Sequence, residues 1–468
     1  MKRDELEGGK IKSPKIMIVL AVAAFVLTRF YILFVLRPWL TDVPLYFQYA
    51  AKAVDFHQTP YQGGFEVNGL SLPYPPLTFW TMCLPRLLDD RRIASAGDPQ
   101  IPLIYLDYRQ IFRGLMFLCD LASFVLILRI IGKRRPSAEG WSAFLYALTT
   151  ALLGHLLYDR LDAGLLALLM SWAYVWTQSI RESEPSIFSI TSAYALIGLG
   201  IGYKIVPVFC VPFLLVAELH CAHRWSRLSA ALAALAVGVG SPFAVQYAVS
   251  GPSVFALFRH HVNRGIQIES LYSTAMMIFA YFGAQISIGH SDGSYILSGD
   301  LSQAMKTASI VISFMFLAGM GFWALWRGAR YSRRDAYCFS LYAVLGAMIL
   351  SNALSPQYFI WTFPLLLLLA VEVLPPGRLS VWMLGILMLA VAAWTTWLCP
   401  YHYFCSASDP RGLVPIIGTA LSPSPVAYIV LGLRNLTCLG VIAWLGAMLY
   451  CRIDEDSAFV RPRAPARD

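Results

Sequence analysis

Long apolar segments recur along the whole chain and constrain its fold more than any other feature. Residues 16–36, 308–322, 358–373 and 380–397 are the clearest of them, and each is long enough, or nearly so, to cross about 30 Å of hydrocarbon. Only 13% of the 468 residues are charged, whereas soluble domains carry about 25%. The sequence therefore predicts an all-α, polytopic membrane protein with one integral membrane domain, residues 1–468, and no soluble module.

We predict about twelve transmembrane helices from the positions of these segments. They lie near residues 16–36, 108–131, 141–157, 164–180, 187–202, 205–219, 227–249, 306–327, 335–352, 357–374, 379–398 and 426–450. The segment 74–88 is short and contains Pro85, so we interpret it as an interfacial or re-entrant piece. The first segment lacks a small-residue cleavage pattern, so we expect a retained helix and not a signal peptide.

The distribution of lysine and arginine predicts the orientation of these helices. Basic residues concentrate in five places: the tail 1–15, the turns 132–136, 224–227 and 327–335, and the tail 451–468. The positive-inside rule then places both termini in the cytoplasm and the protein in the cell membrane as a multi-pass chain. Three long loops fall on the outer face: 37–107, 250–305 and 399–425. We expect binding or chemistry on that face, because function concentrates on loops held by a rigid scaffold.

Charge and cysteine content exclude some classes of partner. The net charge of +9 does not indicate nucleic-acid binding, because no basic stretch is interleaved with aromatics on a soluble surface. The nine cysteines show no metal-ligand spacing. Cys399 and Cys405 share one polar loop, where they either form a disulfide or stay free. We expect no metal and no cofactor.

The first outer loop begins with a lone acid, Asp42, in the stretch Thr41-Asp42-Val43-Pro44. Apolar and aromatic residues between 43 and 57, including Tyr46 and Tyr49, recur at helical spacing, which predicts an amphipathic helix at the membrane surface. Asp42 either caps that helix or faces a site at the boundary of water and lipid, where a carboxylate can act as a base. The two interpretations are compatible.

Seven short stretches together resemble a known family. They are "YFQYA" (46–50 region), "TPY" (59–61), "YPPL" (74–77), "CDLASFVLILRIIGKRRP" (119–136), "LIGLGIGYKIVPVFCVPFLLV" (196–216), "NRGIQIESLYS" (263–273) and "SPQYFIWTFPLLL" (355–367). In this order they resemble glycosyltransferases of the GT-C superfamily. The closest pattern is that of family 87, the polyprenyl-phosphate-mannose-dependent mannosyltransferases; the sequence is more distantly similar to the first mannosyltransferase of GPI anchors. The resemblance covers about residues 15–375.

The resemblance implies a reaction and a set of partners. It implies a polyprenyl-phosphate sugar donor, with mannose as the family default, a lipid or glycan acceptor, surrounding membrane lipids and inversion at the anomeric carbon. The GPI enzymes carry two acids where this chain has Asp42 alone, which favours a metal-independent reaction. Asp42 is then the general base. A retaining reaction would need a second nearby carboxylate, for which Glu269 is the candidate.

Cationic side chains near the outer face are the candidates for the donor phosphate. They are Lys204, Arg264 and His261. An ammonium at membrane depth, such as that of Lys204, is costly and usually has a partner or a cavity, although it can also snorkel to the interface. Arg264 and His261 are alternatively part of a solvated basic loop.

Polar and aromatic side chains at the outer ends of helices are the candidates for the sugar and the acceptor: Tyr46, Glu269, Gln357 and Tyr358. Ordinary interfacial placement or helix capping explains them equally well. Asp159, Arg160 and Asp162 either line the same cleft or pair with one another in water, and we favour the pairing. Arg29 and Asp120 lie inside apolar segments, and we expect each to have a partner.

Two other classes of function compete with the enzyme. A transporter or flippase would place its polar residues near the bilayer midplane and often contains repeats, whereas this chain places them at loop starts on one face. An inactive scaffold would share every feature above, because a single acid carries the catalytic interpretation.

Overall fold

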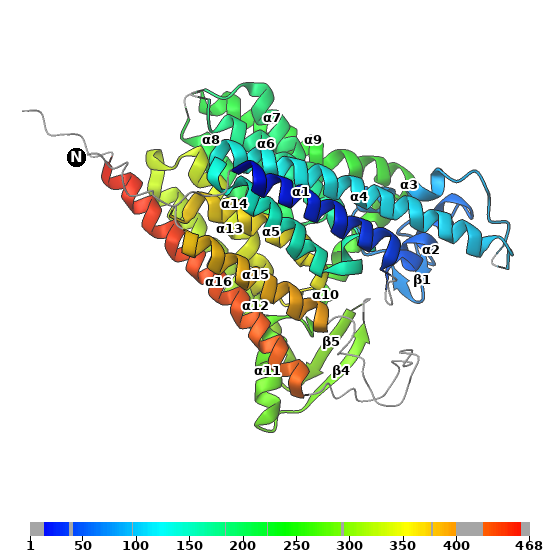
Figure 1. Ribbon diagram of the computed structural model, residues 1–468. Helices are drawn as coiled ribbons and strands as arrows, with labels where there is room; N and C mark the ends of the chain where they lie inside the picture. Colours follow the sequence, from blue (N-terminus) through cyan, green and yellow to red (C-terminus); the bar gives the residue numbers. More distant parts are fainter. Residues whose placement is uncertain are drawn as a thin grey trace, which may run out of the picture.

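The computed structural model describes residues 14–36, 41–95, 97–182, 184–221, 223–291, 294–375, 378–398 and 425–459. These residues form a bundle of helices with two small antiparallel sheets at its margin (Figure 1). The helices are α1 Pro14–Phe30, α2 Val43–Val54, α3 Pro76–Leu87, α4 Ile101–Arg134, α5 Glu139–Leu152, α6 Asp162–Ser179, α7 Ile187–Tyr203, α8 Val211–Leu219, α9 Arg224–Ser250, α10 Ala256–Asn263, α11 Leu271–Tyr281, α12 Ser302–Arg327, α13 Arg333–Leu350, α14 Phe359–Val373, α15 Arg378–Thr396 and α16 Pro425–Phe459.

The prediction of an all-α, polytopic fold is confirmed, whereas the count of twelve spans is not. In the described part of the chain, six helical segments are long and apolar enough to cross a membrane. They are Lys15–Val35, Ile101–Arg134, Arg224–Arg259, Ser302–Arg330, Pro356–Val373 and Val426–Ile453. Shorter apolar helices lie among them, such as α7, whose 17 residues extend about 26 Å at 1.5 Å per residue. A short helix packed between others needs no full bilayer length of its own.

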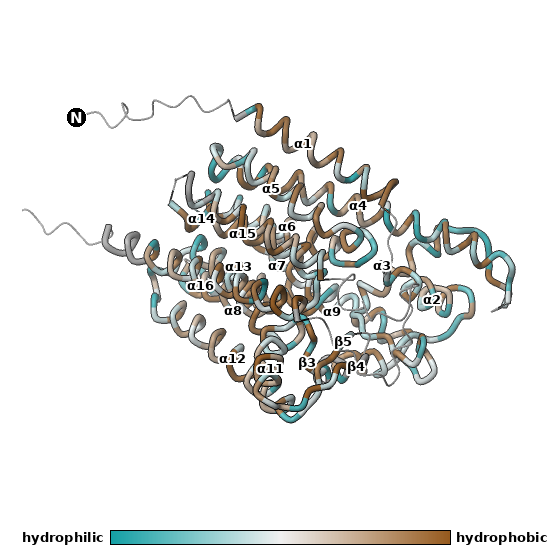
Figure 2. The backbone as a smooth tube through the Cα atoms, turned by 60° about the horizontal axis from the view of Figure 1, so that its bottom comes forward, coloured by the Kyte–Doolittle hydropathy of each residue, from teal (hydrophilic) through white to brown (hydrophobic). Residues whose placement is uncertain are grey.

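The two ends of the bundle differ in what they carry. Figure 1 places the start of α1 and the red end of α16 at one end, and α2, α3 and β1 at the other. Buried carboxylates at the first end bind arginines: Glu372 binds Arg134, with 2.5 Å between Oε1 and Nε, and Glu218 binds Arg333 at 2.8 Å. Figure 2 shows α1 mostly brown, in keeping with exposed apolar side chains such as Leu27 and Phe34.

The predicted amphipathic helix of the first loop exists as α2, but protein and not lipid covers its apolar face. Phe47 packs against Tyr105 and Tyr108, with ring centroids 5.5 and 5.2 Å away. Both tyrosines belong to α4, which begins at Ile101 and not at the predicted residue 108. This longer outer end of α4 is what buries α2.

The segment 74–88 forms α3, a helix of 12 residues with Pro85 inside it. At 1.5 Å per residue it extends about 18 Å, too short for a full span. Its last turn is held by Arg86, which is fully buried and binds Asp55 with 2.6 Å between Nη2 and Oδ1.

The second long loop contains strands that the sequence did not predict. Strands β3 Ile266–Gln267, β4 Ile286–Ser291 and β5 Ser294–Gly299 form an antiparallel sheet in the order β3-β5-β4. Gln267 lies opposite Ile296. A smaller hairpin, β1 Glu66–Val67 with β2 Leu70–Ser71, lies in the first loop. The third loop, including Cys399 and Cys405, falls outside the described residues except for its end.

Candidate active site

The turn at residues 158–162, between a 3₁₀ turn and α6, joins the ends of several helices. Its five residues contact α4, the start of α2 and the end of α7. Tyr158 donates to Asp120 (2.6 Å), Asp159 pairs with Arg113 (3.3 Å), Arg160 pairs with Asp42, the Leu161 carbonyl accepts from Tyr203 (3.0 Å), and Asp162 pairs with Lys204 (2.6 Å). The prediction that Asp159, Arg160 and Asp162 pair with one another in water is therefore wrong. Each of these three residues pairs with a charged residue from another part of the chain, because the turn is packed between other elements.

Asp42 lies at the start of α2 with its carboxylate turned toward this turn. The capping interpretation of its side chain is wrong: Asp42 makes no side-chain cap, and the Thr41 hydroxyl accepts from the Val43 amide at 3.1 Å instead. Arg160 Nη1 binds Asp42 Oδ2, and the Tyr46 hydroxyl approaches the same oxygen at 3.4 Å. The Asp42 side chain is still 29% exposed, so its carboxylate is both held and accessible.

Tyr46 and Tyr74 form the wall next to Asp42. Tyr46 is 1% exposed, its ring lies edge-on to Tyr74 with 5.9 Å between centroids, and the two hydroxyls share a hydrogen bond. Burial raises the pKa of Tyr74, while its hydrogen bond with Tyr46 and the charge of Arg264 oppose that rise. Arg264 therefore lies near the tyrosine pair that borders Asp42.

Lys204 stands where α7 ends and a 3₁₀ turn, Val206–Cys210, begins. Its Nζ lies 2.6 Å from Asp162 Oδ1 and 4.5 Å from the centroid of the Tyr358 ring. Trp361 donates to the same Asp162 oxygen at 2.9 Å. The partner of Lys204 is thus Asp162, and the cost of a half-buried ammonium is met by this ion pair. Lys204 and Asp42 are joined through the turn 158–162.

Arg264 lies at the entrance to β3 in the outer segment. Its Nη2 donates to the Ser294 hydroxyl at 2.7 Å, and Asn352 holds its carbonyl oxygen at 3.4 Å. The Nε of Arg264 is buried without a hydrogen-bond partner among the described residues. This N–H group could therefore donate a hydrogen bond to a ligand. The side chain of His261 lies outside what the structure describes.

Glu269 has a partner that the sequence did not indicate. Arg434, from α16, binds its carboxylate and also donates to its carbonyl oxygen at 2.8 Å, and Asn435 donates to that carbonyl at 3.1 Å. Glu269 therefore ties the segment between β3 and α11 to α16. Asn435 is itself buried in this cluster, where its side-chain amide also donates to the Ser270 carbonyl at 3.0 Å.

The other two predicted contacts lie at the start of α14. Gln357 accepts from the Ser355 hydroxyl at 2.8 Å, and Tyr358 lies under Lys204 with its ring 5.6 Å from that of Trp361. Both side chains are half-buried. Arg160, Asp162 and Trp361 were missed as members of this site. The signal for Arg160 and Asp162 was present: charges in a short turn between two apolar helices.

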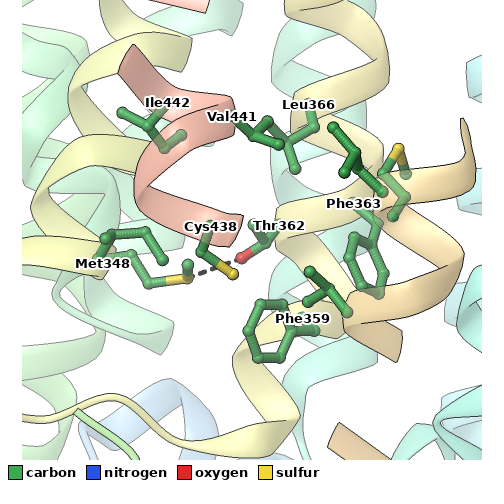
Figure 3. A pocket seen from close by; sticks show the side chains of 12 residues that line it. Met348, Phe359, Thr362, Phe363, Leu366, Cys438, Val441 and Ile442 are labelled. Carbon is green, nitrogen blue, oxygen red and sulfur yellow. Dashed lines mark hydrogen bonds between the residues drawn. The ribbon is translucent and has the colours of Figure 1, made fainter. Parts of the chain in front are cut away.

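An apolar pocket opens beside the same helix start. Its walls come from α13, α14, α15 and α16, and Figure 3 shows Phe359, Thr362 and Cys438 facing it. Thr362 donates to the sulfur of Met348 at 2.8 Å, so the pocket has little free polarity. Phe359 directly follows Tyr358. A second hollow, lined by Asp89, Arg91 and Asp107 among others, is open at the outer surface. Neither hollow has Asp42, Lys204 or Arg264 among its described lining residues.

The described residues thus place a carboxylate, two cations and an apolar pocket near helix ends of a multi-pass membrane protein. The family model described as glycosyltransferase family 87 matches residues 74–356. The chain belongs to this family, and its resemblance to family 87 is confirmed. Lys204 and Arg264 lie inside the matched region, Asp42 precedes it, and Gln357 and Tyr358 follow it.

Two other comparisons complete this picture. No curated protein matches the sequence. Among solved structures, the chain is similar to ArnT from Cupriavidus metallidurans bound to undecaprenyl phosphate, at 14% identity over 93% of this chain and 78% of that chain, with a TM-score of 0.43. The apo structure of the same protein matches at 14% identity over 93% and 76% of the two chains, with a TM-score of 0.45.

Proposed function

We propose that this membrane glycosyltransferase moves a sugar from a polyprenyl phosphate to an acceptor hydroxyl at the outer membrane face, with Asp42 as the general base. Mannose is the sugar that the family favours. The observation that carries the proposal is the placement of Asp42: a half-buried carboxylate whose Oδ2 is held by Arg160 and Tyr46. The side chain is 29% exposed, and we assign its other oxygen, Oδ1, to the acceptor.

The base takes the acceptor proton while the acceptor oxygen attacks the anomeric carbon and the lipid phosphate leaves. Positioned carboxylates of this kind contribute about 10²–10⁴-fold to rate. Because the neighbouring acid Asp162 is engaged by Lys204 and Trp361, and Glu269 by Arg434, Asp42 is the acid we assign to the reacting centre. One acid and direct displacement imply inversion.

Lys204 and Arg264, with His261 three residues before Arg264, are the groups we assign to the departing phosphate. Lys204 would exchange part of its contact with Asp162 for a phosphate oxygen, and Arg264 has an unpaired Nε to offer. At an effective dielectric near 20, a cation about 4 Å from a phosphate contributes about 4 kcal/mol before desolvation. This stabilisation grows as charge develops on the leaving group.

The apolar pocket supports the lipid part of the donor. One of its wall residues, Phe359, adjoins Tyr358, whose ring lies under Lys204. A phosphate at Lys204 would therefore leave its prenyl chain close to apolar walls. Gln357 and Tyr358 suit sugar hydroxyls at the same helix start. We assign buried Tyr46 to holding Asp42, and Glu269 to holding the outer segment.

The decisive experiment is transfer of labelled sugar from polyprenyl-phosphate mannose by purified protein in proteoliposomes. Asp42→Asn should lower the rate at least about 100-fold while binding of polyprenyl phosphate persists. Asp98→Asn is the matched control, because Asp98 accepts only from the loop amides of Ala94 and Gln100. Full activity of Asp42→Asn would overturn the base, a product of retained configuration would overturn inversion, and vesicle uptake that survives Asp42→Asn would favour a transporter.

A further inference from the structure

We propose that Arg160 is the positioning residue for Asp42: it keeps that carboxylate ionised and aims its other oxygen, Oδ1, at the acceptor. This inference rests on the proposed role of Asp42 as base. Arg160 Nη1 binds Asp42 Oδ2, and the two side chains are 13% and 29% exposed. An ion pair at this depth is screened by water less than a pair at the surface, so the guanidinium acts strongly on the carboxylate.

Arg160 can position another group because its own backbone is fixed on both sides. Tyr158 is anchored to buried Asp120 at 2.6 Å, and the Leu161 carbonyl accepts from the Tyr203 hydroxyl at 3.0 Å. The absence of a side chain at Gly164 lets that hydroxyl approach, since a Cβ there would overlap it. The guanidinium is therefore carried on a turn that is tied to α4 on one side and to α7 on the other.

The two other acids of the turn pair with cations other than Arg160, whereas Arg160 pairs with Asp42. Asp159 pairs with Arg113 from α4, and Asp162 pairs with Lys204 from the end of α7. Among the described residues, the groups in contact with Asp42 are Arg160 from the turn and Tyr46 from its own helix, with Tyr74 behind Tyr46. A phenol is neutral near neutral pH, so Arg160 supplies the positive charge next to the base.

Two consequences follow for catalysis. A nearby opposite charge favours the ionised carboxylate, so the enzyme stays active at lower pH than it would with Asp42 alone. The contact at Oδ2 also sets the orientation of Oδ1, which takes the acceptor proton as the acceptor oxygen bonds to the anomeric carbon and the phosphate leaves with the electrons of the broken bond. After transfer, the neutral carboxyl returns its proton to water, and the ion pair forms again.

The test compares Arg160→Gln and Arg160→Lys in the transfer assay across pH. For Arg160→Gln we expect kcat to fall at least about tenfold and the acidic limb of kcat/KM to move up by about 1 pH unit or more, with the donor KM within about threefold of the native value. Arg160→Lys should restore the acidic limb but only part of kcat, because an ammonium lacks the planar fork of a guanidinium. Arg129→Gln, an exposed change on α4, is the control and should alter neither.

Several outcomes separate the possibilities. An unchanged pH profile with a donor KM raised tenfold or more would make Arg160 a phosphate ligand and overturn this proposal. Unchanged kinetics in Arg160→Gln, with Asp42→Asn inactive, would overturn it and leave the proposed function standing. Full activity of Asp42→Asn would instead overturn the proposed function itself. If Arg160→Gln does not fold, Arg160→Lys carries the test, and a native kcat in that variant would contradict the positioning role.

Discussion

The guanidinium of Arg29 and the carboxylate of Asp120 form an ion pair inside the helical bundle, with 2.9 Å between Nε and Oδ2 and both residues at most 1% exposed. The hydroxyls of Tyr146 and Tyr158 donate to the same carboxylate. The pair joins α1 to α4, and through Tyr158 it reaches the turn that carries Arg160. This buried ion pair thus helps to hold the turn that carries Arg160 in place.

Removing one partner of this pair should destabilise the protein strongly. Arg29→Met leaves Asp120 buried without its cation, and such changes cost about 3–5 kcal/mol. We expect a large fall in the thermal unfolding midpoint in detergent. The double variant Arg29→Met with Asp120→Asn should recover part of that fall, because it buries no unpaired charge. Arg129→Met on the exposed face of α4 is the control; an unchanged midpoint in Arg29→Met would contradict a structural role for the pair.

Lys204 and Asp162 should differ in their effect on the donor although they bind each other. Lys204→Gln removes the cation assigned to the phosphate, so we expect undecaprenyl phosphate to bind at least about tenfold more weakly, which is about 1.4 kcal/mol. Asp162→Asn can keep the hydrogen bond from Trp361 and leaves the lysine in place, so its binding should change less than about threefold. Titration of both proteins with the lipid measures this, and native affinity in Lys204→Gln would remove Lys204 from the phosphate site.

The orientation in the membrane can be tested with a native cysteine. Cys451 is exposed near the end of α16, the end that the positive-inside rule places in the cytoplasm. In a protein carrying Cys399→Ser and Cys405→Ser, a membrane-impermeant maleimide should label Cys451 only after the cells are permeabilised. A cysteine introduced at Asn68 in the β1–β2 turn should be labelled in intact cells, and Cys451→Ser gives the background. Labelling of Cys451 in intact cells would reverse the predicted topology.

The sequence predicted several elements of the site because their signals are local. The spacing of Tyr46 and Tyr49 predicted α2, Pro85 and a short apolar run predicted that α3 is not a span, and the first acid after the first helix pointed to Asp42. The expectation that Arg29 and Asp120 have partners also follows from one physical fact, the cost of a charge at membrane depth. Which partner each charge takes is not local information.

Length, apolar periodicity and the positions of charges along the chain determined that this is a multi-pass helical membrane protein with its candidate groups near helix ends. Only the tertiary structure decided the pairings, such as Arg29 with Asp120 across 91 residues and Glu269 with Arg434 across 165. The hydrophobic pattern of a helix depends on that helix alone. The partner of a buried carboxylate depends on which cations the packing of the helices brings within contact distance. That is why the sequence could name Asp42 and Lys204 but not Arg160 and Asp162, which hold them.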